Sequence, residues 1–392
     1  MNTETVKELL NSYQTPMYVF DIGILRKRVA YLKERLPENV SLCYAVKANT
    51  FIMKELDDII DRFEVCSPGE LSICRELKMP MEKIIFSGVY KTPSVVNDLM
   101  DKEVPIGIYS AESMVQYRLL VDASKKAGTK IKIMPRLTSG NQFGMTEDEI
   151  KDIIKEVREN ELLDICGIQF FSGTQKTSLK KQKRELEHVD EFLQTLKEEL
   201  DFTQEELEFG PGFPVTYFQG EDFDEDEYLN EFSNLIREMN FKSKITLELG
   251  RSIAACCGSY LTKVVDMKTN KGQNYAIVDG GINQLVYFGQ SMAMKHPLCH
   301  MYPEREDGVI NNWNLCGSLC TVNDILVKQL PIMDLKLDDV IVFDNTGAYC
   351  MTEGIALFLS RDLPEIVFID EDKKHKSVRK TSPTHPINTP NY

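Results

Sequence analysis

Short apolar runs alternate with longer charge-rich segments over residues 41–250, and this alternation constrains the fold more than any other feature. The strand-like runs fall at residues 41–48, 63–67, 83–88, 104–110, 130–138, 164–172, 206–212 and 244–250. Helical spacing is clearest between them at residues 111–127, 147–160, 178–200 and 224–240. Eight strands alternating with helices predict an α/β fold, a closed parallel (β/α)8 barrel of the TIM type.

The pattern changes after residue 250, where β-rich runs follow one another without long helices between them. These runs fall at residues 260–268, 273–279, 324–331, 340–344 and 365–369. We therefore expect a barrel domain of residues 26–250 and a mostly antiparallel β domain of residues 1–25 and 251–370. The lysines and prolines of residues 371–392 predict a disordered tail.

Chemistry in a (β/α)8 barrel lies at the carboxyl ends of the strands. In this chain those ends carry charged residues and glycine turns: Lys47, Ser67, Gly88, Arg136, Gly173-Thr174, Gly210-Pro211-Gly212 and Glu248-Leu249-Gly250-Arg251. A purely structural barrel does not need such a rim, so we expect the active site there.

Lys47 is the single lysine in the small and apolar stretch Tyr44–Thr50. Burying a lysine is costly unless its amine is paired or used chemically. Burial also lowers the pKa of the amine, which makes it available for a Schiff base. The alternative is a packed stem whose charged end reaches water.

Two glycine turns and one acidic strand end suggest a cofactor. The turns Gly173-Thr174 and Gly210-Pro211-Gly212 let backbone N–H groups approach a phosphate, although ordinary turn glycines are the alternative. Glu248 and Arg251 form either a simple ion pair or the partners of a protonated ring nitrogen and a phosphate. Pyridoxal 5'-phosphate (PLP) needs a lysine, a phosphate cradle and a group that tunes its ring nitrogen.

Composition excludes several classes of protein. The formal net charge of −15 counts against a nucleic-acid or anionic-membrane binder. Ten cysteines include no Cys-x-x-Cys pair, so we expect no metal site, and we expect His296 and His300 in a loop or on the surface. The cysteine usage, together with the lack of an apolar signal or membrane-spanning run, favours the cytoplasm.

Six segments in one order carry a family resemblance. They are Tyr44–Asn49, Phe63–Ser67, Gly210–Pro214, Glu248–Arg251, Gly317–Cys320 with Asp324, and Gly347–Tyr349. Together they resemble the PLP-dependent decarboxylases of the alanine-racemase fold (fold type III), which include diaminopimelate, ornithine and arginine decarboxylases. The resemblance extends from about Tyr13 to about Ser360.

This resemblance implies roles for the matched residues. Lys47 would bind the aldehyde of PLP, Glu248 would pair with the pyridine nitrogen, and Glu64 and Arg136 would lie near the ring and the lysine. The phosphate would be held by Thr174, Gly212, Arg251 and Tyr349, and Gly210 would also belong to the cofactor site. In a homodimer with shared active sites, Cys320 would enter the facing site as the protonating or product-shaping residue.

The chain also departs from the family pattern. Phe171 stands where a histidine stacks on the cofactor, and an aromatic ring can still do so. Thr321 replaces an acidic residue that grips a substrate amine. The segment 283–288, which contains Tyr287, lacks an arginine that diaminopimelate decarboxylases use. The last two departures count against a free diamino acid, and Thr321, Tyr287 and Asp324 are the candidate substrate residues.

Three short segments are closer to a branch of the family that serves secondary metabolism. They are Gly280–Asn283, Phe288–Gln290 and Cys320-Thr321. That branch includes decarboxylases of amino acids tethered to acyl carrier proteins, so we expect a PLP-dependent amino-acid decarboxylase that acts on such a substrate.

Three alternatives stay open. They are a decarboxylase of free diaminopimelate, ornithine, lysine or arginine, an amino-acid racemase, and a catalytically silent regulatory homologue. Glu248 favours decarboxylation over racemisation because a carboxylate at the ring nitrogen deepens the electron sink. Retention of Lys47, Glu248, Arg251 and Cys320 counts against the silent homologue.

Five cations crowd one short segment: Lys176, Lys180, Lys181, Lys183 and Arg184. Cations near a helix start oppose its dipole and cost about 0.3–1 kcal/mol each where exposed, so local stability does not explain them. They form either a solvated face balanced by Glu185 and Glu187 or a docking patch for an acidic carrier protein.

Overall fold

The computed structural model describes residues 1–290 and 292–391 and divides the chain into two units. The barrel unit contains Val29–Pro214 and Phe223–Ile253. The β unit contains Met1–Arg28, Val215–Asp222 and Ala254–Tyr392. The expected boundaries at residues 26 and 250 lie close to these, but the sequence gives no sign that residues 215–222 belong to the β unit. Among the described residues, no helix is long and apolar enough to cross a membrane.

The barrel unit confirms the predicted closed parallel barrel. Its eight strands are β2 (Val40–Ala45), β3 (Arg62–Val65), β4 (Ile84–Phe86), β5 (Ile108–Ala111), β6 (Ile131–Leu137), β8 (Gly167–Phe171), β9 (Glu206–Gly210) and β10 (Lys244–Leu249). Parallel pairing runs from β5 back to β2, then through β10, β9 and β8 to β6, and β5 pairs with β6 to close the circle. A short extra strand, β7 (Leu163–Ile165), pairs with the start of β6.

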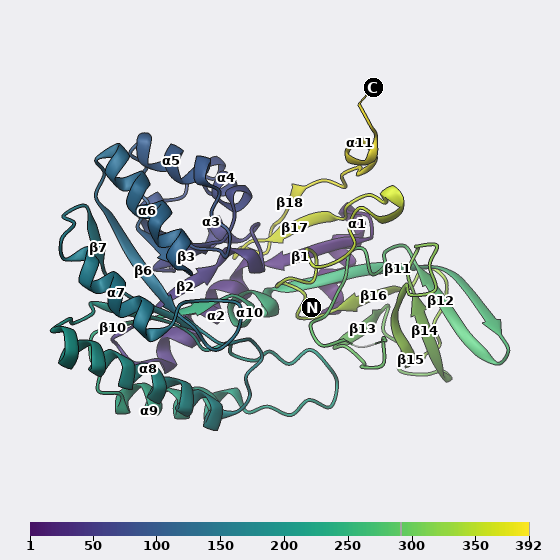
Figure 1. Ribbon diagram of the computed structural model, residues 1–392. Coiled ribbons are helices and arrows are strands. Elements are labelled where there is room, and N and C mark those ends of the chain that lie inside the picture. Colours follow the sequence, from purple (N-terminus) through teal and green to yellow (C-terminus); the bar gives the residue numbers. More distant parts are fainter. Residues whose placement is uncertain (291, 392) are drawn as a thin grey trace. The chain divides into compact units, whose positions relative to one another are not determined.

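Helices surround these strands (Figure 1). They are α3 (Met53–Leu56), α4 (Pro68–Glu76), α5 (Pro93–Asp101), α6 (Met114–Ala127), α7 (Glu147–Val157), α8 (Leu179–Leu200) and α9 (Glu225–Glu238), after α2 (Ile22–Arg35). Several begin at a side chain that accepts a hydrogen bond from the first turn, as Ser67, Thr146 and Ser178 do. Local sequence therefore fixes where these helices start, and their apolar faces pack on the barrel.

The β unit holds one sheet of nine strands. They are β1 (Met17–Asp21), β11 (Gly258–Asn270), β12 (Gln273–Val278), β13 (Cys299–Tyr302), β14 (Ile310–Cys316), β15 (Ile325–Met333), β16 (Val340–Phe343), β17 (Glu365–Ile369) and β18 (His375–Arg379). The expected strand near Tyr18 is β1, which pairs antiparallel with β11 and parallel with β17. Most other neighbours are antiparallel, as predicted, and only β12 and β14 add a second parallel pair in the described sheet. Helix α1 (Thr3–Ser12) packs on this sheet through Val6 and Leu9.

The prediction of a disordered tail from residue 371 is wrong for the described residues. Strand β18 pairs antiparallel with β17, and the short helix α11 (His385–Asn388) follows it. Lys380 Nζ lies 2.8 Å from Glu365 Oε1, and Arg379 donates to the carbonyl of Pro364 at 2.8 Å. The composition of the tail is polar, which predicts disorder, but its partners Pro364 and Glu365 lie at the start of β17 and are brought to it only by the tertiary fold.

Candidate active site

Lys47 lies just beyond β2 in a single 3-10 turn, η1 (Val46–Ala48). Its neighbours Tyr44, Val46 and Ala48 are buried, whereas 41% of its own side chain is exposed. The amine donates to Glu64 Oε2 at 2.7 Å and to Glu248 Oε1 at 3.0 Å. Its charged end is therefore held between two carboxyl groups rather than simply extended into water.

Glu64 and Glu248 lie near the carboxyl ends of β3 and β10, the two strands that flank β2, and both contact the amine of Lys47. Both are buried, on β3 and β10 respectively. Burial and the negative charge of Glu64 raise the pKa of Glu248 to about 8. Burial opposes ionisation of Glu64 as well, but the charge of Lys47 and hydrogen bonds more than offset it and lower the pKa of Glu64. Two carboxyl groups in one environment thus differ in protonation, which is the condition for separate chemical roles.

The structure adds a residue that the sequence did not single out. Cys66 Sγ lies 3.8 Å from Lys47 Nζ. Burial raises the pKa of this thiol, so it stays protonated. Its position directly after β3 was the available signal.

Arg136 and Phe171 lie close together near the carboxyl ends of the paired strands β6 and β8. The guanidinium of Arg136 is 5.7 Å from the centre of the Phe171 ring, and it donates to the Phe171 carbonyl at 3.4 Å. It also pairs with Glu112 Oε2 at 3.1 Å, a buried partner that sequence reasoning missed. Arg136 is therefore held in place before any ligand binds.

The two predicted phosphate turns touch each other. A Cβ added to Gly212 would lie 2.1 Å from the carbonyl oxygen of Gly173, and one added to Gly210 would lie 2.2 Å from Cδ2 of Phe171. Arg251 Nε donates to Thr174 Oγ1 at 3.3 Å. Glycine is thus required at both positions, and a hydroxyl, a guanidinium and bare backbone meet at one place, which suits a phosphate group. The donor set of this rim fits PLP.

The remaining predicted site residues belong to the β unit. Cys320 is exposed, and Thr321 and Tyr349 are half-buried. Asp324 is buried, and its two carboxylate oxygens accept from the backbone N–H groups of Ile282 (2.9 Å) and Leu319 (2.7 Å). Its carboxylate therefore holds the loop that carries Cys320, and its contact with a substrate stays a prediction.

Tyr287, the third candidate substrate residue, also has its polar atom paired within the β unit. It is buried, its ring packs against Tyr217 and Phe218, and its hydroxyl donates to the carbonyl of Asp344 at 2.8 Å. The sequence identified a departure from the family pattern at this position, but this tyrosine's polar atom is used within the β unit.

The five-cation segment divides into two groups. Lys180, Lys183 and Arg184 are exposed, and Lys181 is half-buried near Glu185. Lys176 is buried, with 3% of its side chain exposed, so it cannot belong to a docking patch. Its contacts are with the two glycine turns.

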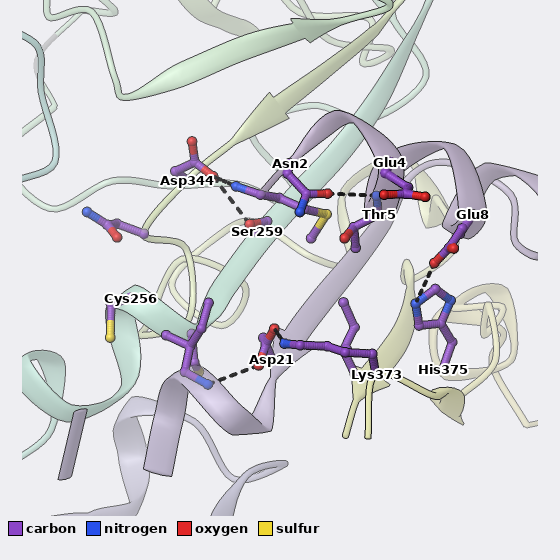
Figure 2. Close-up of a pocket in the computed structure, with 15 residues that line it drawn as sticks. Asn2, Glu4, Thr5, Glu8, Asp21, Cys256, Ser259, Asp344, Lys373 and His375 are labelled. Carbon is purple, nitrogen blue, oxygen red and sulfur yellow. Dashed lines mark hydrogen bonds and ion pairs between the residues drawn. The ribbon is translucent and has the colours of Figure 1, made fainter. Parts of the chain in front are cut away.

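A cavity of about 700 Å³ lies within the β unit (Figure 2). Its charged groups face one another: Lys373 Nζ lies 2.9 Å from Asp21 Oδ2, and His375 lies 3.9 Å from Glu8. None of the predicted site residues lines it. Cavity size alone therefore does not locate the chemistry in this chain.

Known proteins match nearly the whole chain. Residues 22–255 match the family model of the pyridoxal-binding domain of pyridoxal-dependent decarboxylases. A diaminopimelate decarboxylase of Aquifex aeolicus is 26% identical over 364 residues, which cover 88% of this chain and 84% of that protein. The decarboxylase of the L-glutamyl BtrI acyl-carrier protein of Niallia circulans is 26% identical over 406 residues, 96% of this chain and 93% of the relative.

Solved structures match the fold equally well. The crystal structure of diaminopimelate decarboxylase from Helicobacter pylori complexed with L-lysine has a TM-score of 0.85 and 22% identity, and the match covers 97% of this chain and 98% of that one.

Proposed function

The chain belongs to the family of pyridoxal-dependent decarboxylases, and we propose that it decarboxylates an amino acid tethered to an acyl carrier protein. Its cofactor is PLP, which when bound supplies an electron sink for the electrons left behind by CO2. The observation that carries this function is the amine of Lys47 held between Glu64 and Glu248 at the barrel rim.

Lys47, Glu64 and Glu248 would have different chemical roles because their protonation states differ. Lys47 Nζ would bind the cofactor aldehyde after it gives up its proton, and Glu64, the ionised carboxylate of the pair, lies 2.7 Å away to take that proton. Glu248 would supply a proton to the ring nitrogen and stay beside it as the carboxylate, since its raised pKa leaves it protonated near neutral pH in the cofactor-free protein. Thr174, Arg251 and the backbone at Gly212 would bind the phosphate.

The tethered substrate rests on two observations. The Niallia circulans relative, whose substrate is carried by an acyl carrier protein, aligns over 96% of this chain. Lys180, Lys183 and Arg184 are exposed in the first turns of α8, at the rim end of the barrel, where an acidic partner would meet them. Loss of CO2 requires a free α-carboxylate, so the tether must join the substrate through its side chain.

Charge reversal tests this substrate. Replacing Lys180, Lys183 and Arg184 with glutamate should raise KM for a carrier-loaded amino acid at least about tenfold and leave turnover of a soluble pantetheine-linked analogue unchanged. The matched control reverses Lys125, Lys126 and Lys130, three exposed cations at the opposite end of the barrel strands. Equal kinetics for both variants, or efficient turnover of free diaminopimelate, ornithine or lysine, would refute the tethered substrate while leaving decarboxylation intact.

We also propose a homodimer in which Cys320 completes the site of the facing subunit. The loop that carries Cys320 is exposed at its tip although Asp324 holds its base. The segment Ile355–Leu359 exposes several apolar side chains, and Arg361, which follows it, donates to the Ser318 carbonyl in the same loop at 2.7 Å. An apolar surface beside an exposed reactive loop is suited to burial by a second copy.

Mixed dimers test this arrangement. Co-expression of a Lys47→Ala chain with a Cys320→Ala chain should restore activity to about a quarter of the native level, because in a mixed dimer one site keeps both residues. Activity equal to that of either variant alone, in preparations shown to contain mixed dimers, would place both residues in one subunit.

The proposed location is the cytoplasm. All ten cysteines are free thiols, including the adjacent pair Cys256 and Cys257. Recovery of the protein from a non-cytoplasmic fraction would contradict this location.

A further inference from the structure

A buried lysine–glutamate pair lies behind the two glycine turns of the barrel rim. Lys176 is 3% exposed and Glu185 is 9% exposed. The amine donates to Glu185 Oε2 at 2.7 Å and to Ser172 Oγ at 3.0 Å, and Ser172 in turn donates to Glu185 Oε1 at 2.6 Å. These three groups form a closed polar triangle among otherwise packed side chains.

Lys176 also joins the two turns directly. Its amine donates to the carbonyl of Gly210 at 3.3 Å, and its backbone N–H donates to the carbonyl of Gly212 at 2.9 Å. Lys176 itself follows the first turn, Gly173-Thr174, by two residues. The chain segment that supplies the Thr174 hydroxyl is thereby fastened at two points to the segment that supplies the Gly212 backbone.

A second set of contacts holds the same segments from α8 and α9. Gln182 Nε2 donates to the carbonyl of Pro211 at 2.7 Å and to the Tyr228 hydroxyl at 2.8 Å. That hydroxyl donates to the carbonyl of Lys176 at 2.6 Å. Lys176 is therefore the residue where the contacts to both turns converge.

Stability alone does not account for this lysine. A buried ion pair must overcome the desolvation of both charges, and well-packed apolar residues of the same size often serve a fold equally well. Burial lowers the pKa of Lys176, although Glu185 opposes this. The charge is thus maintained at a cost, directly behind the turns proposed to bind a phosphate dianion.

We infer that Lys176, held by Glu185, is a positioning residue for the phosphate of the cofactor. It keeps the turns Gly173-Thr174 and Gly210–Gly212 at the separation at which their donors reach one phosphate, and it places a positive charge behind them. This inference rests on the proposed phosphate site, and it assigns a function to a residue that the sequence grouped with the exposed cations.

The test compares PLP with pyridoxal, which lacks the phosphate. Dissociation constants of both compounds are measured on the full-length, cofactor-depleted protein by the change in cofactor absorbance. Lys176→Met should raise the Kd of PLP about tenfold or more, the loss expected for one charge-assisted hydrogen bond, and should leave the Kd of pyridoxal within about twofold. Lys155→Met, which removes an exposed lysine paired with Asp152 on α7, is the matched control and should change neither Kd.

A second variant keeps the test decisive if an unpaired Glu185 prevents folding. Lys176→Met combined with Glu185→Gln leaves no buried charge and preserves side-chain volume, and it should show the same selective loss of PLP affinity. Equal weakening of PLP and pyridoxal, or no change in either variant, would overturn the inference.

Identifying the lysine that carries the cofactor distinguishes a failure of this inference from a failure of the proposed site. Borohydride reduction followed by peptide mapping identifies the lysine that carries PLP in the native protein. Attachment to a lysine other than Lys47 would refute the site and the inference together. Attachment to Lys47 with an unchanged ratio of the two dissociation constants would refute only the role of Lys176.

Discussion

Gly212→Ala is the substitution whose effect the structure defines most sharply. Gly212 has φ of +59°, and an added Cβ would lie 2.1 Å from the carbonyl oxygen of Gly173 and 2.9 Å from Cα of Thr174. Both neighbours are backbone atoms, so no side-chain rotation can relieve the contact. The two turns must move apart.

The size of the effect follows from these distances. Real Cβ contacts are essentially never below 3.0 Å, so the turns must separate by close to an ångström. That displacement breaks the 2.9 Å hydrogen bond from Lys176 N–H to the Gly212 carbonyl, which is worth about 1 kcal/mol. Alanine in a left-handed conformation adds about 1–2 kcal/mol. Loss of one backbone donor to the phosphate should weaken PLP binding by about 1.5–3 kcal/mol, roughly ten- to a hundredfold in Kd.

Gly128→Ala is the matched control. Gly128 ends α6 in the same unit, has φ of +65°, and has no atom within 4 Å of an added Cβ. It therefore carries the conformational strain without the collision. The assay measures the melting temperature and the Kd of PLP for both variants. If Gly212→Ala lowered the melting temperature no more than Gly128→Ala and retained native PLP affinity, the assignment of this turn to the phosphate site would be wrong.

Three further predictions concern the chemical centre. Lys47→Ala should abolish the borohydride-trapped PLP adduct, detected by mass spectrometry, and an adduct that persists on another lysine would contradict the central assignment. Glu248→Gln should lower turnover at saturating PLP at least about a hundredfold, and undiminished turnover would refute the electron-sink role of Glu248. Glu248→Gln also changes the response of the cofactor-free protein to pH. Burial and Glu64 raise the pKa of Glu248 to about 8, so this carboxyl stabilises the fold while protonated, and that stability is lost as pH rises toward the folded pKa. The native protein should therefore lose up to about 1.4 kcal/mol per pH unit between about pH 5 and pH 8, a loss that the variant lacks, and melting temperatures that change in parallel would contradict the raised pKa.

The sequence by itself determined the architecture of the barrel unit and the identity of its rim. Strand-like runs and amphipathic helices are local periodic patterns, and each of the eight predicted strands has its counterpart in the barrel. Whereas Glu64 was implied only by the family resemblance, the position of Lys47 and Glu248 on one rim follows as well, because the carboxyl ends of parallel strands meet on one side of a barrel. The glycine turns were identifiable for the same reason.

The tertiary structure alone decided which partner each charged side chain has. Lys176 was indistinguishable from its exposed neighbours in the sequence because burial depends on α8, α9 and the turn after β9, which are distant in the chain. Asp324 and Tyr287, two candidate substrate residues, have polar atoms that bind backbone groups more than 40 residues away in the chain, at Ile282 and Asp344, and the sequence did not show these partners. The ordered strand β18 depends likewise on β17. Local pattern specifies helices, strands and turns, whereas the burial and pairing of a polar side chain are set by contacts across the fold, which no short stretch of sequence contains.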